Sequence, residues 1–505
     1  MVRTDSNQEP VAIGQEWLRR ELSLDVPAPA VESYIIQGAR RTAVHGARTC
    51  EFFPRHYAVD ATLASHLRFA LRHEPIDLGV LVAALKTMQP AEIETWVRAE
   101  PTGAYSRRAW FFYETFTGRT LDLEDARNGN YVDALDSARH VVADGRKSPR
   151  HRVIDNLLGT SGLCPMVRRT ARLSAQMGTR IDEEARALIQ SYDPVTLSRA
   201  VNYLYTKETR SSFAIEGETP SSSRTERFVA ALKAAPTFTL NKESLIQLQG
   251  QIVDPRYAAH DWRSFQNFVG NTVSGYREEV HFICPRPQDV AGLMNAWLAM
   301  MTRLEQGSVD PVIAAAISAF AFVFVHPFAD GNGRIHRFLM HHALAKRAYS
   351  PAGVIFPISA AILRDRRSYD QVLETFSKPL GEFIDWHWTP EQEIAIGNET
   401  ADLYRYFDAT LFAEYLYDRV ADTVRRDLKE ELGFVAVFDR AFIAVREIVD
   451  MPDRRASLFV RLCMQNGGRL SAAKRSQFPE LSDPEVTQLE AQVQGAISAE
   501  AAAHS

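Results

Sequence analysis

A run of fourteen residues, Val312–Val325, is apolar apart from Ser318, and it constrains the fold of this chain more than any other feature. The run is shorter than the ~20 apolar residues that a membrane-spanning helix needs. The preceding pair, Asp310-Pro311, supplies a carboxylate that can cap a helix and a proline suited to the first helical position. We therefore predict a buried helix that begins at Pro311 and continues to the end of the run.

The length and composition exclude several classes of protein. The chain has 505 residues, of which 46% are hydrophobic and 24% charged, so extensive disorder and fibrous repeats are excluded. A chain of this length is expected to form more than one domain. With 58 basic and 63 acidic side chains the net charge is −5, which argues against a protein built mainly to coat nucleic acid or an anionic membrane.

The cysteines and the N-terminus indicate the compartment. The four cysteines show no C-x-x-C spacing, so we predict neither a structural zinc site nor a disulfide framework. Residues 1–25 contain no apolar stretch of the kind found in secretory signals. We expect a cytoplasmic protein with no membrane association. The cysteines are Cys50, Cys164, Cys284 and Cys463.

The chain is expected to comprise three consecutive parts. Residues 1–170 form an N-terminal domain of unknown role, in which the aromatic run 109–116 is typical of a buried helix or strand. Residues 171–380 are predominantly helical and hold the informative motifs. Residues 381–505 form a helical C-terminal domain, in which segment 458–497 could be either a helix-turn-helix or a compact helical cap.

The segment that follows the apolar helix has the composition of an anion site. Gly331 and Gly333 flank Asn332 at the start of a second helix, so that backbone N–H groups can converge on a phosphate. Arg334 and Arg337 are three residues apart on that helix and project from one side of it, within reach of more distal phosphates.

Two further side chains in this segment suggest a reaction. Asp330, directly before the glycines, offers the hard oxygen ligands that Mg²⁺ prefers. His326 supplies a side chain that can take a proton near neutral pH. A base, a metal carboxylate, an anion site and two guanidinium groups together indicate group transfer from a nucleotide to a hydroxyl.

The segment His326–Arg337 resembles the Fic family signature H-P-F-x-D-G-N-G-R-x-x-R, and every specified position is matched. The resemblance extends over about 240–379 and includes the run Trp262–Gly270. It implies an all-α fold with a small β-hairpin flap, flanked by mainly helical N- and C-terminal domains. It also implies a protein adenylyltransferase that uses ATP as co-substrate with Mg²⁺ and moves AMP to a Ser, Thr or Tyr hydroxyl of another protein.

The resemblance gives each specified residue a role. His326 would deprotonate the target hydroxyl, Phe328 would anchor the loop in the core, and Asp330 would hold Mg²⁺. The remaining residues would contact the nucleotide: Gly331, Asn332 and Gly333 at the α- and β-phosphates, and Arg334 and Arg337 at the β- and γ-phosphates.

Two other segments are assigned by the same resemblance. Residues 271–285, with the turn residues Ser274-Gly275, match the flap, and the protein substrate would bind along it near 273–283. Tyr369 lies where similar proteins place an aromatic residue near the adenine, although a core tyrosine would show the same pattern. Relatives that use this site as a kinase carry lysine at the position of Gly331, so the glycine favours adenylyl transfer.

A further motif precedes the core. The segment Ser212–Gly217 resembles the family motif [ST]-x-x-x-E-[GN], at the end of a helix expected near 205–217, in the subgroup whose inhibitory helix is N-terminal. Glu216 would pair with Arg337 and so occupy the guanidinium that the γ-phosphate needs. Glu216 could act only as an inhibitor, or could also orient a water that removes AMP from a modified target.

Other functions remain compatible with the sequence. The chain could be a DNA-associated regulator or a toxin of a toxin–antitoxin pair, if segment 458–497 binds DNA. A Fic enzyme could also use another donor, such as UTP or a phosphocholine nucleotide. The sequence does not indicate a target protein or an oligomeric state.

Overall fold

The structure is a computed structural model that describes residues 9–46, 48–273 and 277–503. Its contacts divide the chain into two compact units. The first comprises Met1–Thr179, Ala234–Arg347 and Asp365–Tyr417, and the second comprises Arg180–Lys233, Ala348–Arg364 and Asp418–Ser505. The units interleave along the chain, and the three consecutive domains expected from the sequence stay a prediction. Most of the described chain is helical, which confirms the predicted fold class.

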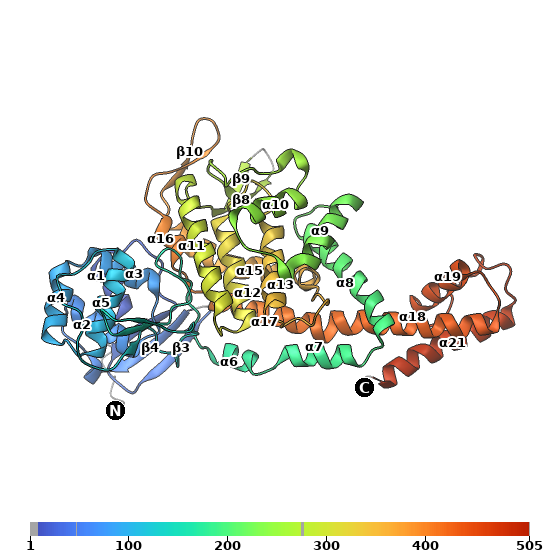
Figure 1. Cartoon of the computed structure of the whole chain (residues 1–505), viewed down its shortest axis with the longest axis horizontal. Helices are drawn as coiled ribbons and strands as arrows, with labels where there is room; N and C mark the ends of the chain where they lie inside the picture. Colours follow the sequence, from blue (N-terminus) through green and yellow to red (C-terminus); the bar gives the residue numbers. More distant parts are fainter. Residues whose placement is uncertain (1–8, 47, 274–276, 504–505) are drawn as a thin grey trace, which may run out of the picture. The chain divides into compact units, whose positions relative to one another are not determined.

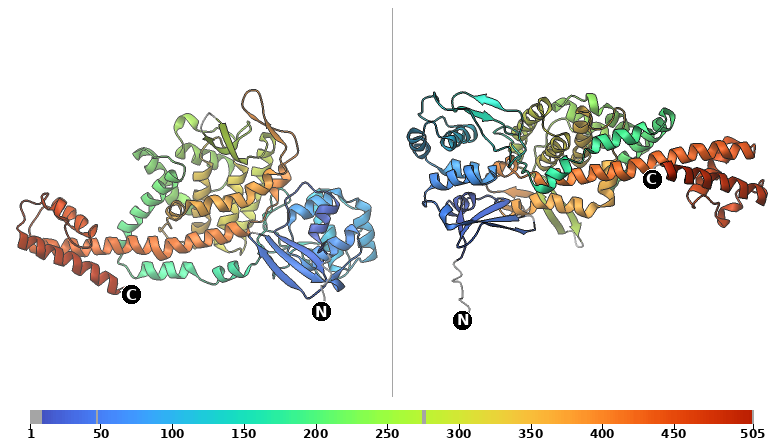
Figure 2. Two further views of the ribbon diagram at one scale, coloured as in Figure 1. Left: turned by 180° about the vertical axis from the view of Figure 1, so that it is seen from behind. Right: turned by 90° about the horizontal axis from the view of Figure 1, so that it is seen from below.

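The N-terminal part of the first unit pairs a sheet with a group of helices. The four strands lie in the order β1-β2-β4-β3, with β2 and β4 parallel and the other pairs antiparallel. Helices lie to one side of this sheet (Figures 1 and 2). The elements are β1 (Val11–Ile13), α1 (Gln15–Glu21), β2 (Val31–Ile36), β3 (Arg41–His45), β4 (Arg48–Pro54), η1 (Arg55–Tyr57), α2 (Leu63–His73), α3 (Leu78–Thr87), α4 (Pro90–Ala99) and α5 (Ala104–Thr117).

The aromatic run 109–116 lies in α5, where Trp110 and Phe112 are 1% and 0% exposed, so the prediction of a buried element is confirmed. The sheet is an addition to the mainly helical domain that we predicted. Its strands are three to seven residues long, and every residue of β3 is at least partly exposed, so the sequence lacks a clear strand pattern there. A smaller sheet and a helix follow: β5 (Val132–Asp133), β6 (Arg146–Ser148), β7 (Val153–Asp155) and α6 (Ala171–Met177).

The remainder of the first unit is helical around α12 (Pro311–Val325), the helix predicted from the apolar run. Asp310 accepts hydrogen bonds from the backbone N–H groups of Val312 and Ile313 at 2.9 and 3.1 Å, as an N-cap should. Helix α12 packs between α11 and α13 (Figure 1). The neighbouring elements are η2 (Ala235–Thr237), α10 (Lys242–Ile252), η3 (Pro255–Tyr257), α11 (Pro287–Gln306), α13 (Asn332–Lys346), α15 (Arg366–Gly381), β10 (Trp386–Trp388), β11 (Ile394–Ile396), α16 (Ala401–Arg405) and α17 (Thr410–Asp422).

The expected hairpin flap is present. Strands β8 (Phe268–Val273) and β9 (Arg277–Ile283) form an antiparallel two-stranded sheet with a register shift at Val269 and Gly270. The predicted turn at Ser274-Gly275 lies outside the described residues. At the base of the flap, the ring of Phe282 packs on that of Phe324 in α12, with centroids 6.0 Å apart.

The second unit is a set of helices arranged around α8 and α18. Helix α18 contacts α8, α19 and α21, and runs beside α21 (Figure 2). Its C-terminal half shares a core with α19 and α21 that includes Val445, Phe459 and Leu489. The elements are α7 (Ile181–Gln190), α8 (Pro194–Ile215), α9 (Ser222–Ala234), α14 (Ile358–Arg364), the π-helix η4 (Thr423–Leu428), α18 (Lys429–Ile448), α19 (Asp453–Met464), α20 (Ala472–Arg475) and α21 (Asp483–Ala503). Among the helices of the described residues, none is long and apolar enough to cross a lipid bilayer.

Candidate active site

His326 ends helix α12 in a left-handed backbone conformation, with φ at 52°. Its Nδ1 lies 3.1 Å from the carbonyl oxygen of Val323, and because a carbonyl can only accept, Nδ1 donates this hydrogen bond. The Nε2 of a neutral ring therefore carries the lone pair that can take a proton. Burial lowers the pKa of His326 to about 4, so the ring is neutral at physiological pH.

Arg263 holds the loop that contains His326. Its guanidinium donates from Nε to the carbonyl of His326 at 2.8 Å and from Nη2 to the carbonyl of Pro285 at 2.6 Å. Its backbone N–H donates to the carbonyl of Pro327 at 2.8 Å. Arg263 is 5% exposed, and burial lowers its pKa. One side chain thus joins the loop to the segment directly after the flap.

Two side chains of the loop itself, Phe328 and Asn332, hold its centre in place. Phe328 is fully buried, and its ring lies 5.1 Å from that of Trp262. The side chain of Asn332, 2% exposed, accepts from the backbone N–H of Phe328 at 3.0 Å and donates to the carbonyl of Phe328 at 2.8 Å. The amide of Asn332 therefore shapes the loop, and a phosphate contact from this residue would have to come from its main chain.

Gly331 is the N-cap directly before helix α13 and has φ at 88°, a left-handed conformation that favours glycine. A Cβ atom at this position would lie 2.9 Å from Cγ1 of Val253, so there is no space for a side chain. The first N–H groups of a helix have no partner within the helix, and the helix dipole adds partial positive charge there. The start of α13 can therefore bind an anion on its main chain.

Gln249 of α10 supports the same turn from outside. It is fully buried and donates to the carbonyl of Asp330 at 3.2 Å and to that of Tyr257 at 3.1 Å. It also accepts from the backbone N–H of Ala259 at 2.8 Å. Sequence reasoning identified neither Gln249 nor the role of Arg263, because both act on main-chain groups distant in sequence. The only signal was that Arg263 lies within the Trp262–Gly270 run.

Asp330 is the carboxylate of the site. Its Oδ1 accepts from the backbone N–H of Gly331 at 2.5 Å and from Nη2 of Arg334 at 2.6 Å, and its side chain is 44% exposed. A partly exposed carboxylate beside an anion-binding helix start suits a Mg²⁺ ion whose other ligands are phosphate oxygens and water. The donor type and exposure of Asp330 therefore fit the expected metal role.

Two guanidinium groups lie in the first two turns of α13. Arg334 is fully buried and Arg337 is 1% exposed, although arginine is rarely buried to this extent. A cation at a helix N-terminus is repelled by the positive end of the helix dipole, and an anion bound there reduces this repulsion. The loop thus gathers cations, main-chain donors and a neutral imidazole.

The structure places Tyr369 in the core beside α13. It is 6% exposed, and its ring lies 6.1 Å from that of His336 and 6.1 Å from that of Tyr415. This environment fits the core tyrosine that the sequence left as an alternative. The contact with adenine stays a prediction.

The inhibitory motif lies at the C-terminus of α8, in the second unit. Ser212 is fully buried, Glu216 is exposed at the helix end, and Gly217 has φ at 72°. The N–H of Glu218 donates to the carbonyl of Phe213 at 3.1 Å, as in a helix C-terminus closed by glycine. The pairing of Glu216 with Arg337 would join residues of different units and stays a prediction.

Comparisons with known proteins agree on the family of this domain. Residues 239–344 match the Fic/DOC family. A Protein adenylyltransferase Fic from Nematostella vectensis is 26% identical over 232 residues, which cover 40% of this chain and 50% of the relative. A protein of the same name from Drosophila virilis is 40% identical over 105 residues, or 21% of this chain and 19% of the relative.

The matches cover only part of these relatives. The chain spans half or less of the length of the curated relatives described here. The crystal structure of a Fic family protein from Desulfovibrio desulfuricans is 21% identical, with a TM-score of 0.38, and the match covers 63% of this chain and 86% of that one. The match to the family includes the His326–Arg337 motif, and residues 239–344 of this chain therefore form a domain of the Fic/DOC family.

Proposed function

We propose that this protein is an adenylyltransferase that moves AMP from ATP to a Ser, Thr or Tyr hydroxyl of a target protein. The observation that carries the proposal is the position of His326 directly before the anion-binding start of α13. Its Nδ1 is held by a backbone carbonyl, so its Nε2 is the basic atom. The names of the relatives, Protein adenylyltransferase Fic, support the same reaction.

His326 would act as the general base. Nε2 takes the proton of the target hydroxyl as its oxygen attacks the α-phosphorus of ATP. A bond forms between that oxygen and the α-phosphorus, while the bond to the bridging oxygen of the β-phosphate breaks and pyrophosphate leaves with the electron pair. The contribution of the protein is mostly positioning and charge stabilisation.

The start of α13 would hold the phosphates. Main-chain N–H groups of Asn332 and Gly333, and that of Gly331 once its bond to Asp330 gives way, would bind the α- and β-phosphates, while Arg334 and Arg337 would balance charge on the β- and γ-phosphates. Asp330 would hold Mg²⁺, which when bound supplies further neutralisation of phosphate charge. A Cβ atom at Gly331 would lie 2.9 Å from Cγ1 of Val253, so the turn that would hold the phosphates favours glycine at this position.

The flap would align the target protein. The two-stranded sheet of β8 and β9 has an outer edge on each strand, to which an extended segment can add by main-chain hydrogen bonds. Such binding along residues near 273–283 needs little from the target sequence. This explains why the target cannot be identified from the flap.

Glu216 would be an inhibitor of this reaction. The support is the motif match and the observed helix end, where Gly217 lets the chain turn and leaves the carboxylate of Glu216 exposed. Pairing with Arg337 would compete with the γ-phosphate for the guanidinium. Removal of AMP from a modified target is the second reaction that this carboxylate could assist.

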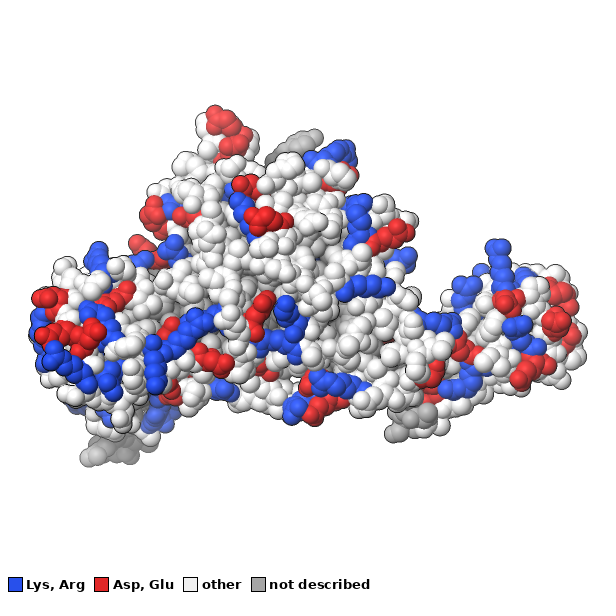
Figure 3. Space-filling model, in the orientation of Figure 1, with Lys and Arg blue, Asp and Glu red and all other residues white. Residues whose placement is uncertain are grey.

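DNA binding by segment 458–497 stays a prediction. In this segment the short helix α20 contains Lys474 and Arg475, whereas the long helix α21 contains no Lys or Arg and carries several acidic residues. On the face shown in Figure 3, basic and acidic side chains alternate over the C-terminal helices. A DNA-binding surface is expected to concentrate positive charge.

The proposal is tested with isotopically labelled ATP. We expect weak labelling of protein by the wild type, strong labelling by Glu216→Gly, and none by Glu216→Gly/His326→Ala. Competition with unlabelled UTP and other nucleotides identifies the donor. Labelling that persists without His326 would contradict the assigned base, and equal labelling by wild type and Glu216→Gly would remove the inhibitory role.

A further inference from the structure

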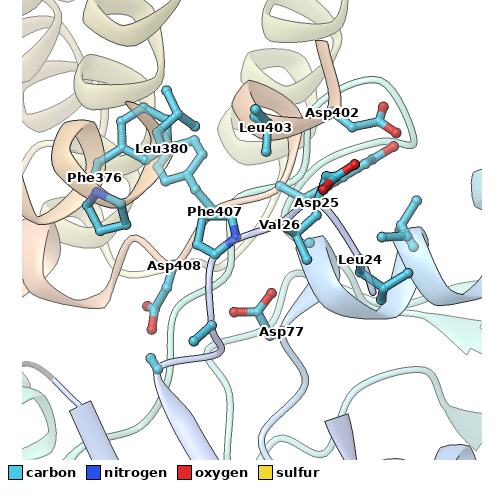
Figure 4. Close-up of a pocket in the computed structure, with 18 of the residues that line it drawn as sticks. Leu24, Asp25, Val26, Asp77, Phe376, Leu380, Asp402, Leu403, Phe407 and Asp408 are labelled. Atoms are coloured by element: carbon cyan, nitrogen blue, oxygen red, sulfur yellow. The ribbon is translucent and has the colours of Figure 1, made fainter. Parts of the chain in front are cut away.

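A cavity of the first unit lies away from the His326 loop and has a volume of about 450 Å³. It is bounded by residues 22–30, by α3, by α15 and by residues 399–412 (Figure 4). Its volume lies within the ~300–1,000 Å³ range of small-molecule sites. Leu24, Val26, Phe376, Leu403 and Phe407 supply apolar surface, so the cavity can accept an apolar body.

One wall of the cavity also supports the catalytic helix. The rings of Phe376, Phe407 and Phe412 lie 4.1, 5.7 and 5.3 Å from the ring of Phe324 in α12, measured between centroids. Phe324 is two residues before His326. A molecule that presses on these rings would therefore act on the helix end that carries the imidazole, because packed aromatic cores transmit displacement.

The charges around the cavity favour a cation. Five carboxylates line it against three basic side chains. Asp402 is paired with Lys86, and Asp408 with Arg168 at 2.6 Å. Glu399 is paired with Arg286, which lies outside the lining. Asp402 is also paired with Arg405 at 2.9 Å, so within the described residues Asp25 and Asp77 are the lining carboxylates that form no ion pair.

Asp77 is the carboxylate that a ligand could use. Its Oδ1 accepts from the backbone N–H of Val80 at 3.1 Å, and within the described part of the chain it forms no ion pair. Burial, with the nearby charge of Asp408, raises the pKa of Asp77 to about 6 despite the opposing effect of Arg168. A cation beside Asp77 would offset that unfavourable desolvation.

We propose that this cavity is a regulatory site for an organic cation, a primary amine with an apolar body. The ammonium group would pair with Asp77, and the apolar body would pack on Leu403, Phe376 and Phe407. A bound amine would alter the reaction rate through the contact of the aromatic wall with Phe324. Only this last effect rests on the proposed function; the binding site does not.

Calorimetric titration of the full chain at pH 7.5 tests the site with two probes of one shape, 4-phenylbutylamine and 4-phenylbutan-1-ol. We expect the amine to bind about tenfold more tightly than the alcohol, as for a charge-assisted hydrogen bond. Asp77→Asn should abolish that preference while keeping the helix cap, because asparagine caps as well as aspartate. Asp122→Asn, at a fully exposed side chain, is the matched control and should keep the preference.

A second variant tests whether the probes bind in this cavity. Ala83→Leu, which extends a side chain of α3 into the cavity, should weaken binding of both probes. Equal binding of amine and alcohol to the wild type, or binding unaffected by both Asp77→Asn and Ala83→Leu, would overturn the proposal. In the Glu216→Gly background, saturating amine should change the rate of labelling. An unchanged labelling rate would overturn the regulatory coupling. If the amine binds but the Glu216→Gly variant labels no protein at all, the binding site stands and only the proposed function is contradicted.

Discussion

Gly331→Ala is the substitution whose effect follows most directly from the structure. A Cβ atom would be placed 2.9 Å from Cγ1 of Val253 and would sit on a backbone with φ at 88°. The left-handed conformation costs an alanine about 1–2 kcal/mol, partly offset by about 0.4–1 kcal/mol from the restricted unfolded chain. Val253 is fully buried and cannot move away without cost. The turn is therefore expected to shift, which displaces the N–H groups that would bind phosphate.

The expected result is a large loss of ATP affinity with a small loss of stability. Losing one charge-assisted hydrogen bond to phosphate costs about 1.5–3 kcal/mol, or roughly ten- to a hundredfold in affinity. We expect the dissociation constant for ATP, measured by calorimetry in the Glu216→Gly background, to rise by that factor. The thermal midpoint should fall by only a few degrees.

A double-mutant cycle separates contact from backbone strain. Val253→Ala removes the atom that Cβ would meet, so Gly331→Ala/Val253→Ala should recover part of the ATP affinity. The φ penalty remains, so recovery should be incomplete. Unchanged ATP affinity in Gly331→Ala would refute the reasoning, and so would a double variant no better than Gly331→Ala alone.

Three further predictions concern groups that hold the site or the helices. Arg263→Lys should retain more labelling activity than Arg263→Met, because lysine can replace some donors to the carbonyls of His326 and Pro285; equal activities would contradict this. Labelling by the Glu216→Gly variant should stay constant from pH 8 to about pH 5 and fall as the pH approaches 4, because the imidazole of His326 is then protonated and can no longer act as a base. A fall centred near pH 6.5 would contradict the lowered pKa of His326. Glu208 is fully buried in α8 and accepts from the backbone N–H of Ser359 at 2.8 Å through one carboxylate oxygen and from the hydroxyl of Ser359 through the other. Glutamine keeps only one acceptor oxygen, so Glu208→Gln should destabilise the fold by about 1.5–3 kcal/mol in thermal denaturation, whereas the exposed control Glu226→Gln should have no effect.

The sequence predicted those parts of the fold that local patterns determine. Helix α12 follows from a continuous apolar run behind an Asp-Pro start, and both signals act within a few residues. The N-terminal sheet could not be predicted in this way. Strands β2 and β4 are parallel neighbours in the sheet, although β3 lies between them in the sequence, so their pairing depends on contacts distant in sequence. The strands are also short, so their residues show little periodicity.

The same distinction applies to the candidate site. The residues of the His326–Arg337 segment are recognisable from their spacing, but the conformation of the loop depends on residues outside it. Arg263 fixes the carbonyl of His326, and Gln249 fixes that of Asp330. Both contacts join a side chain to a main-chain oxygen, which any residue provides, so the contacted positions leave no trace in the sequence.

A motif of this kind therefore defines the reactive groups but not their geometry. If Arg263 were lost, the imidazole would keep its bond to Val323, while the loop would lose its connection to the carbonyl of Pro285 after the flap. The base would then keep its chemistry and lose its position relative to an incoming hydroxyl. Since a displacement of about 1 Å can cost a hundredfold in rate, the first residues to compare among chains with this signature are those at the positions of Arg263 and Gln249.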